Sequence, residues 1–165
     1  MMPGPRPGTL TWRVGLSLTL WAFILNFAWE MVQGGYFAGM VEMFWWSATK
    51  LCLRASVGDA LMVGLAYWVV ASVTRDPDWI SGKDVRKYAA FMLLAAVQAL
   101  ALEHYSVAAG RWRYLPAMPV DPFFGLGLVP ILQWLILPVL AAWVVRRALL
   151  LRSRGRPARE RAQGR

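Results

Sequence analysis

Four long apolar runs decide what this chain can fold into. They cover about residues 14–33, 56–73, 88–109 and 123–145, and each is close to the ~20 residues that a helix needs to cross a bilayer. Of all 165 residues, 58% are apolar and only 16% are charged, which is more apolar surface than a soluble domain of this size hides. We therefore predict an all-α integral membrane protein, a four-transmembrane-helix bundle whose single transmembrane domain covers residues 1–150.

The first apolar run also has the basic flank of a signal peptide, because Arg6 and Arg13 precede it. No small-x-small cleavage site follows, however, and the run is too long for a signal peptide and is interrupted by Asn26 and Glu30. We expect it to be the first span.

Residues 36–54 show a different pattern. Apolar side chains recur there at helical spacing, at Phe37, Met40, Val41, Phe44, Trp45 and Ala48. The polar residues Glu42, Thr49 and Lys50 lie elsewhere on the same helix, as is typical of an amphipathic helix in the headgroup region. A fifth span is the alternative, but it needs a turn near residues 50–54, where the sequence has neither Gly nor Pro. We predict an additional interfacial amphipathic helix.

The distribution of basic residues predicts the orientation of the chain. With four spans, both termini and the linker 75–87 share one side, which holds 14 of the 18 Lys and Arg residues. The other side holds Lys50, Arg54, Arg111 and Arg113. Since basic loops stay in the cytoplasm, we predict a multi-pass protein of the bacterial inner membrane with cytoplasmic N- and C-termini.

Residues 151–165 form a basic tail, which continues an arginine-rich stretch that starts at Arg146. Gly155 and Pro157 oppose a continued helix, so we expect a disordered cytoplasmic tail that contacts anionic lipid. We expect no nucleic-acid binding, because no aromatic side chains accompany these arginines as a stacking platform.

The chain has one cysteine and one histidine, Cys52 and His104. A single thiol forms neither an internal disulfide nor a CxxC pair, and a single histidine excludes bis-histidine haem ligation within the chain. No nucleotide-binding motif is present, and we expect no cofactor. Glu30, Asp59, Glu103 and His104 are an oxygen-rich set that could hold a metal ion, but their spacing matches no known metal motif, so no metal site is predicted.

Three acidic residues fall inside the spans, namely Glu30, Asp59 and Glu103. An acidic side chain in a bilayer costs about 2.5–3.5 kcal/mol on insertion scales, so each needs a reason. At a rise of 1.5 Å per residue the three lie roughly 5, 5 and 9 Å from the outer ends of their spans. We predict that they meet at one level in the outer half of the bundle.

Other polar and aromatic side chains are expected at this level as substrate-binding residues. They are Asn26, Trp29 and Gln33 in the first span, Gln98 and His104 in the third, Gln133 in the fourth, and Arg111, Trp112, Arg113 and Tyr114 in the outer loop. An extended loop can place both arginines on one side, above the carboxyls. For His104, the alternative is a hydrogen-bonded residue at a helix end.

Two interpretations of the acidic residues stay open. In the first they form a polar clamp, in which the carboxyls pair with Arg54, Arg111 or Arg113 or with one another and hold the helices together. In the second they line a pocket that opens to the outer leaflet, where carboxyls in an apolar site serve as general acid and base.

Two short motifs resemble those of membrane-bound isoprenoid enzymes. Asn26-Phe27-Ala28-Trp29-Glu30 resembles the Trp-Glu helix signature of small membrane-embedded terpene cyclases. The pattern Glu103…Gly110-Arg111-Trp112-Arg113-Tyr114…Pro119 is similar to the carboxylate-then-Gly-x-Trp-x-Tyr/Phe pattern of heterodimer-type lycopene cyclases and carotenoid hydratases. The whole chain also resembles a compact family of small bacterial inner-membrane proteins.

The resemblance implies acid/base cyclisation, hydration or isomerisation of an isoprenoid or another membrane lipid. Glu30 and Glu103 would be the acid and base, and Asp59 would shift the pKa of one of them. The chain departs from those enzymes, which generally have more spans, and it has Gln133 where a late carboxylate motif is expected; a homodimer could complete the site. The alternative from a different class is a non-catalytic subunit or lipid-binding scaffold of a larger membrane complex.

Overall fold

Four long helices make up most of the chain. The computed structural model describes the backbone of residues 7–163 and the side chains of residues 12–151. The helices are α1 (Pro7–Gln33), α2 (Trp45–Thr74), α3 (Val85–Ala108) and α4 (Leu128–Gln163), with short 3-10 helices η1 (Gly34–Tyr36) and η2 (Trp79–Ser81). Each of the four contains a segment long and apolar enough to cross a membrane, so the prediction of an all-helical chain with four such segments is confirmed.

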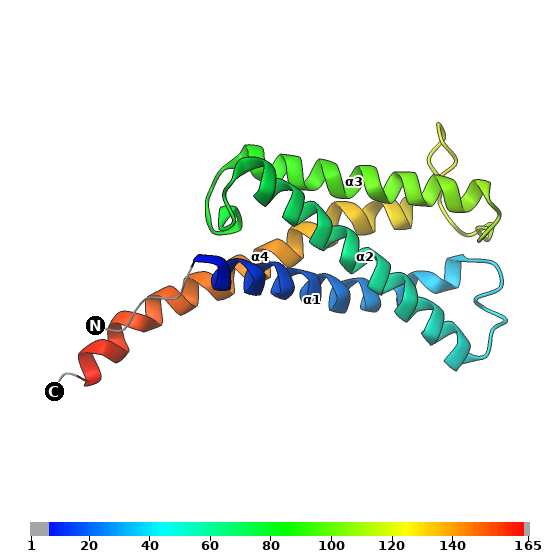
Figure 1. The fold of residues 1–165 in the computed structure, drawn as a ribbon. Coiled ribbons are helices and arrows are strands. Elements are labelled where there is room, and N and C mark those ends of the chain that lie inside the picture. Colours follow the sequence, from blue (N-terminus) through cyan, green and yellow to red (C-terminus); the bar gives the residue numbers. More distant parts are fainter. Residues whose placement is uncertain (1–6, 164–165) are drawn as a thin grey trace.

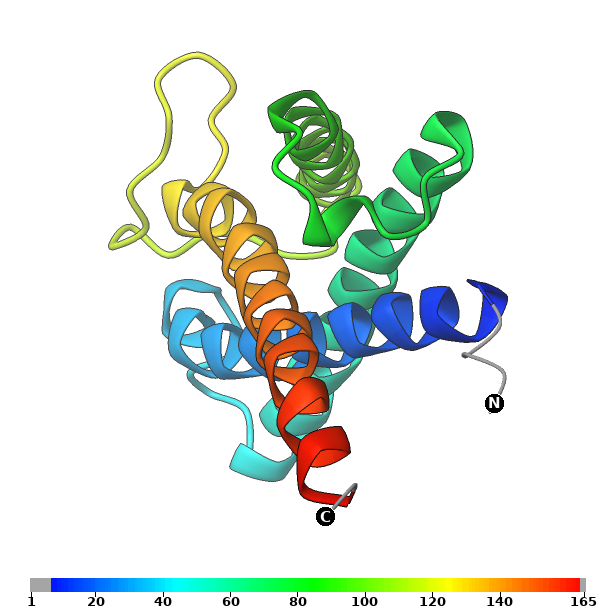
Figure 2. The same ribbon diagram turned by 90° about the vertical axis from the view of Figure 1, so that its left-hand side faces the viewer.

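The helices alternate in direction along the bundle. α1 and α3 run one way and α2 and α4 run back, so Pro7 and the C-terminal part of α4 lie toward the same end (Figure 1). α1 packs against α2 and α4, and α3 packs against the same two helices, which gives a ring of four. Viewed along the bundle, α3 is close to end-on and the other helices are inclined (Figure 2). We call the end with residues 34–44 and 109–127 the outer end and the opposite end the inner end.

The apolar core occupies the inner half. Its largest fully buried apolar side chains are Trp79, Tyr67, Phe91, Leu18 and Ile80. The ring of Trp79 packs against Tyr67 and Tyr88, with centroids 5.8 and 5.1 Å away. The Tyr67 hydroxyl donates to the carbonyl oxygen of Pro77 at 2.7 Å, and the Tyr88 hydroxyl donates to that of Ile80 at 2.5 Å. The inner connection is therefore folded into the bundle and closes its inner end.

Two glycines let α1 and α2 approach closely, as small residues do in membrane bundles. A Cβ atom on Gly15 would lie 2.9 Å from the Trp68 ring, and one on Gly64 would lie 2.5 Å from Thr19 Oγ1. Thr19 Oγ1 itself donates to the carbonyl oxygen of Gly15 at 3.0 Å. The contact between the two helices therefore depends on the absence of side chains at both positions.

The expected interfacial helix over residues 36–54 is not found as a separate element. Residues 37–44 form turns, and Trp45 already begins α2, which continues without a break to Thr74. The physical reason is that no Gly or Pro separates residues 45–54 from the apolar run that starts at residue 56. The second half of the amphipathic pattern is therefore the outer end of a transmembrane-length helix.

The starts of two other helices differ from the prediction. α1 begins at Pro7, a residue favoured in the first helical turn, rather than near residue 14. α4 begins at Leu128 rather than Phe123, because Asp121 accepts hydrogen bonds from the backbone of Phe123, Phe124 and Leu126 and holds that segment in a turn.

The basic tail was expected to be disordered, but α4 continues through Gly155 and Pro157 to Gln163. Leu, Arg, Ala and Glu, which favour helices, predominate in this stretch. The predicted contact of the tail with anionic lipid concerns side chains outside the described ones, and the last two residues lie outside the described residues altogether.

Candidate functional site

Five polar side chains from three helices meet in the outer half of the bundle. They are Asn26, Glu30 and Gln33 of α1, Asp59 of α2 and Gln133 of α4, which we call the polar network. All but Glu30 are buried. The three α1 members share a face because they are spaced by four and then three residues.

The side-chain amide of Gln133 is the centre of the polar network. Its Nε2 lies 2.7 Å from Asn26 Oδ1, 3.0 Å from Asp59 Oδ2 and 3.2 Å from Glu30 Oε1. Gln33 Nε2 donates to the same Glu30 oxygen at 2.6 Å and to Gln133 Oε1 at 2.9 Å. Since an amide nitrogen carries only two hydrogens, the three acceptors around Gln133 share two N–H groups.

Two further residues border this network. The indole Nε1 of Trp29 donates to Gln33 Oε1 at 3.2 Å, which fixes the orientation of the Gln33 amide. The thiol of Cys52 lies 3.5 Å from the backbone carbonyl oxygen of Glu30. Cys52 was not predicted to be near the site, because its place at the outer end of α2 follows only from the early start of that helix.

Glu103 lies apart from the polar network, on the last turns of α3. It accepts a hydrogen bond from the Tyr114 hydroxyl. Burial, with the bond to Glu103, raises the pKa of Tyr114 well above its usual range, so the hydroxyl stays protonated and remains a donor.

Aromatic rings cover Glu103 from the outer end. Phe37 packs against Tyr114 and Trp112, with ring centroids 5.6 and 6.2 Å away. The Trp112 indole faces the Glu103 carboxyl, and its Nε1 is buried without a hydrogen-bond partner. The indole N–H is therefore directed at the carboxyl without completing a full hydrogen bond.

The aromatic cover exists because the two outer loops pair with each other. The backbone N–H of Ala38 donates to the carbonyl oxygen of Arg113 at 2.8 Å, and that of Leu115 donates to Tyr36 at 2.9 Å. These bonds flank an antiparallel bridge between Phe37 and Tyr114. The sequence pattern placed Phe37 on an interfacial helix. Its contact with Tyr114 could not be predicted, because the two residues are 77 positions apart and no local sequence pattern indicates that their loops pair.

A small cavity of about 70 Å³ lies between α3 and α4 beside Glu103. Its other walls are apolar and include Ala96, Ala99, Leu100, Ile131, Trp134 and Leu135. Glu103 is the one ionisable residue that lines it. The spacing of Ala96, Ala99 and Glu103 on one face of α3 could have indicated this wall from the sequence.

Four of the predicted substrate-binding residues are brought neither to the polar network nor to Glu103. Gln98 Nε2 donates to the backbone oxygens of Leu94 and Met62 at 3.1 and 3.4 Å and joins α3 to α2. His104 and Arg113 are exposed. The Arg111 guanidinium lies over the Tyr105 ring, 5.1 Å from its centroid.

The clamp made of carboxylate–arginine pairs is therefore not formed. Among the residues whose side chains are described, one ion pair occurs, between Lys87 and Asp76 at 2.5 Å near the inner end. Arg111 and Arg113 do not sit over the carboxyls as ion-pair partners, because the loop turns their side chains outward to a tyrosine ring and to solvent. The helices are joined instead through the neutral amides of Gln33 and Gln133.

No metal centre is evident in the described part of the chain, where no three His, Cys, Asp or Glu residues are placed to hold one ion. His104 in particular is exposed. The oxygen-rich set considered from the sequence is thus spread over the polar network, the cavity and the surface.

Comparisons of the chain with models of protein families, with curated proteins and with solved structures found no match.

Proposed function

We propose that this is a multi-pass protein of the bacterial inner membrane that transfers a proton to and from an isoprenoid or another unsaturated lipid. The observation that carries the proposal is that Glu103 is the one ionisable group lining an apolar cavity between α3 and α4. Apolar walls with a few placed polar groups are typical of sites for small hydrophobic ligands. A volume of about 70 Å³ has room for one short branch of such a lipid, and the rest of the chain would lie in the bilayer.

The proposed chemistry is acid/base catalysis. Glu103, as the carboxylic acid, donates its proton to a carbon of a double bond, which leaves a carboxylate and a carbocation. The cation then loses a proton from the neighbouring carbon to the carboxylate, which isomerises the double bond. Alternatively, a second double bond of the same lipid or a water molecule attacks the cation before the proton is returned, which gives cyclisation or hydration. Every proton is accounted for, and no redox partner is needed.

The surrounding groups suit a cationic intermediate. The rings of Trp112, Tyr114 and Trp134 lie around Glu103 or its cavity, and aromatic faces attract a cation within about 6 Å. The Tyr114 hydroxyl orients the carboxyl. Glu30 and Asp59 do not line the cavity, so in this proposal they do not touch the lipid and belong to the polar network that joins the helices.

A second candidate function, a non-catalytic scaffold of a larger membrane complex, is favoured by a different observation. The polar network satisfies its amide donors internally and connects α1, α2 and α4. A network of this kind stabilises a bundle without any substrate. Under this reading the cavity beside Glu103 holds bulk lipid only.

The test compares Glu103→Gln with Glu42→Gln, an equal change at an exposed residue of the same outer side. Cells that lack the gene are complemented with each variant, and their lipids are measured by mass spectrometry. We expect Glu103→Gln to insert and melt like the parent while the lipid change caused by the deletion persists, and Glu42→Gln to restore the lipids. A deletion that leaves the lipid profile unchanged, or full restoration by Glu103→Gln, would overturn the enzyme proposal. If Glu103→Gln instead loses a protein that co-purifies with the parent, this result would support the scaffold function.

A further inference from the structure

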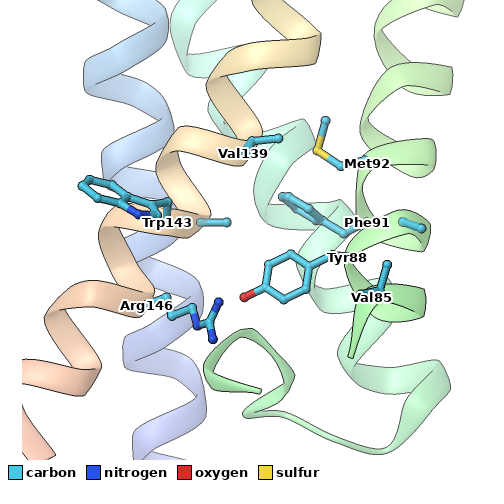
Figure 3. A pocket seen from close by; sticks show the side chains of 9 residues that line it. Val85, Tyr88, Phe91, Met92, Val139, Trp143 and Arg146 are labelled. Atoms are coloured by element: carbon cyan, nitrogen blue, oxygen red, sulfur yellow. The ribbon is translucent and has the colours of Figure 1, made fainter. Parts of the chain in front are cut away.

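A second and larger cavity lies at the inner end, between the first turns of α3 and the middle of α4. Its volume is about 350 Å³, within the ~300–1,000 Å³ range of small-molecule sites. Met92, Val139 and Trp143 line its apolar part, and Tyr88 and Arg146 supply its polar groups (Figure 3). Arg146 lies thirteen positions after Gln133 along α4, or about 20 Å at the helical rise, so this cavity is distinct from the outer site.

The cavity opens on the outside of the bundle rather than into its core. Three of its lining side chains, Val85, Val139 and Trp143, are 77, 51 and 53% exposed. Phe91 and Ala142, at its floor, are buried. In a protein with membrane-spanning helices, a groove of this shape faces the acyl chains of the surrounding lipid.

Arg146 brings a positive charge to the edge of this apolar groove. Its guanidinium lies beside the Tyr88 hydroxyl (Figure 3), and its Nε is buried with no hydrogen-bond partner. The Tyr88 hydroxyl already donates its proton to Ile80, so it offers Arg146 only an acceptor. Within the described side chains no carboxylate pairs with Arg146, because the one ion pair joins Lys87 to Asp76.

A second arginine, Arg147, does not line the groove but contacts Trp143, which does. The guanidinium of Arg147 lies over the Trp143 ring, 5.4 Å from its centroid. One guanidinium at the edge of an apolar groove, with a second one nearby, complements an amphiphile with an anionic head, and the guanidinium fork matches phosphate geometry. The charge distribution of the chain predicts that this end faces the cytoplasm, whose leaflet carries anionic lipids.

We propose that this groove is a binding site for one anionic phospholipid of the inner-end leaflet. Its phosphate is held by the Arg146 guanidinium, with Arg147 adding charge nearby. One acyl chain lies along Met92, Val139 and Trp143. The site is independent of the proton-transfer proposal, since it shares no residue with the cavity beside Glu103.

The test uses the full-length protein in detergent, titrated with phosphatidylglycerol, with phosphatidylcholine and with inorganic phosphate, and followed by native mass spectrometry. Arg146→Gln removes the proposed phosphate ligand. The matched control is Arg86→Gln, the same change at an exposed inner-end residue that does not line the groove. We expect the parent to retain phosphatidylglycerol in preference to phosphatidylcholine. Arg146→Gln should weaken this retention about tenfold, as expected for one charged hydrogen-bonded contact, and Arg86→Gln less than twofold.

A third variant tests the groove without changing the charge. Ala89 lines the cavity and is exposed, so Ala89→Phe fills space there without disturbing the core. We expect it to reduce phosphatidylglycerol retention with the melting temperature unchanged, which keeps the test informative even where Arg146→Gln fails to fold. Equal effects of Arg146→Gln and Arg86→Gln, equal retention of the two lipids, competition by millimolar inorganic phosphate, or normal retention by Ala89→Phe would each overturn the proposal.

Discussion

Gln133 Nε2 lies 3.0 Å from Asp59 Oδ2 and joins α4 to α2 across the middle of the ring of helices. The same nitrogen reaches Asn26 and Glu30 on α1. One neutral amide therefore connects acceptors from two other helices, and no cation takes part. The carboxyls are held in place by hydrogen-bond donors that carry no charge, which distinguishes this arrangement from a salt-bridged bundle.

Replacing Gln133 tests the importance of that connection. Gln133→Leu leaves Asp59 Oδ2 and Asn26 Oδ1 without this donor, and we expect a loss of about 1–3 kcal/mol in the free energy of unfolding. The measurement is unfolding in mixed detergent micelles with increasing sodium dodecyl sulfate. Gln98→Leu is the control, because that amide donates only to backbone oxygens. Similar losses for both variants would show that the polar network has no special stabilising role.

The contact between α1 and α2 gives a second prediction, from the same substitution at two glycines. A Cβ on Gly64 would lie 2.5 Å from Thr19 Oγ1, whereas a Cβ on Gly58 meets nothing within 4 Å. We expect Gly64→Ala to destabilise the fold by about 1–3 kcal/mol through overpacking. Gly58→Ala should stabilise it by about 0.5–1 kcal/mol, because alanine loses less backbone entropy in a helix.

The double variant Gly64→Ala/Thr19→Ala checks the cause of the first effect. It removes the hydroxyl that the new methyl group meets, so the two changes should be less than additive. Additive losses would show that the crowding at Gly64 does not come from Thr19.

Asp121 gives a pH-dependent prediction for the outer loop. Its carboxylate accepts from the backbone N–H groups of Phe124, Leu126 and Phe123, and these bonds lower its pKa below the usual value of 3.8. A group whose pKa is lowered on folding stabilises the fold above its unfolded pKa and loses that effect as the pH falls through its folded pKa. We therefore expect the turn at residues 121–126 to loosen below about pH 4.

Hydrogen exchange of the Phe124 and Leu126 amides measures this loosening. Their protection should be constant down to about pH 4 and fall as the pH drops further, after correction for intrinsic exchange rates, because the folded pKa of Asp121 lies below its usual value. Asp121→Asn should show weaker protection at pH 5 and little further change with pH. A parent protein whose protection stays constant below about pH 4 would contradict the prediction.

Thiol labelling checks the predicted orientation. In a Cys52→Ala background, single cysteines replace Ser81 in the inner connection or Ala117 in the outer loop, both of which are exposed. Since most basic residues lie on the inner side, a membrane-impermeant maleimide added to intact spheroplasts should label Ala117→Cys and not Ser81→Cys. Labelling of Ser81→Cys alone would reverse the orientation.

The sequence predicted the site best at positions where a polar side chain is costly to place in an apolar helix. Asn26, Glu30, Asp59 and Gln133 stand out in apolar helices, and the structure brings all four together. Their meeting could be predicted because helical rise fixes the depth of a residue once a span is located. The central position of Gln133 could not be predicted, because the depth of a residue does not show whether its side chain points into the bundle.

The rest of the site depends on contacts between distant segments. Phe37 and Tyr114 meet only because the two outer loops pair through their backbones. The wall of the Glu103 cavity combines residues of α3 and α4. Arg111 and Arg113 form no ion pair with the carboxyls because the outer loop turns their side chains away from the bundle. From the sequence, the arginines around Arg146 indicate only membrane orientation and a basic tail, because no local sequence pattern shows that a groove lies beside them.

The buried Trp79 of the inner connection has a consequence for any small molecule that meets this protein. Because η2 and its aromatic neighbours fill the inner half, packed side chains lie between the described inner loops and the carboxyls. A lipid that reaches Glu103 has to arrive and depart sideways, through the gap between α3 and α4. The proton transfer that we propose would then take place within one leaflet, without movement of the lipid from one face of the membrane to the other.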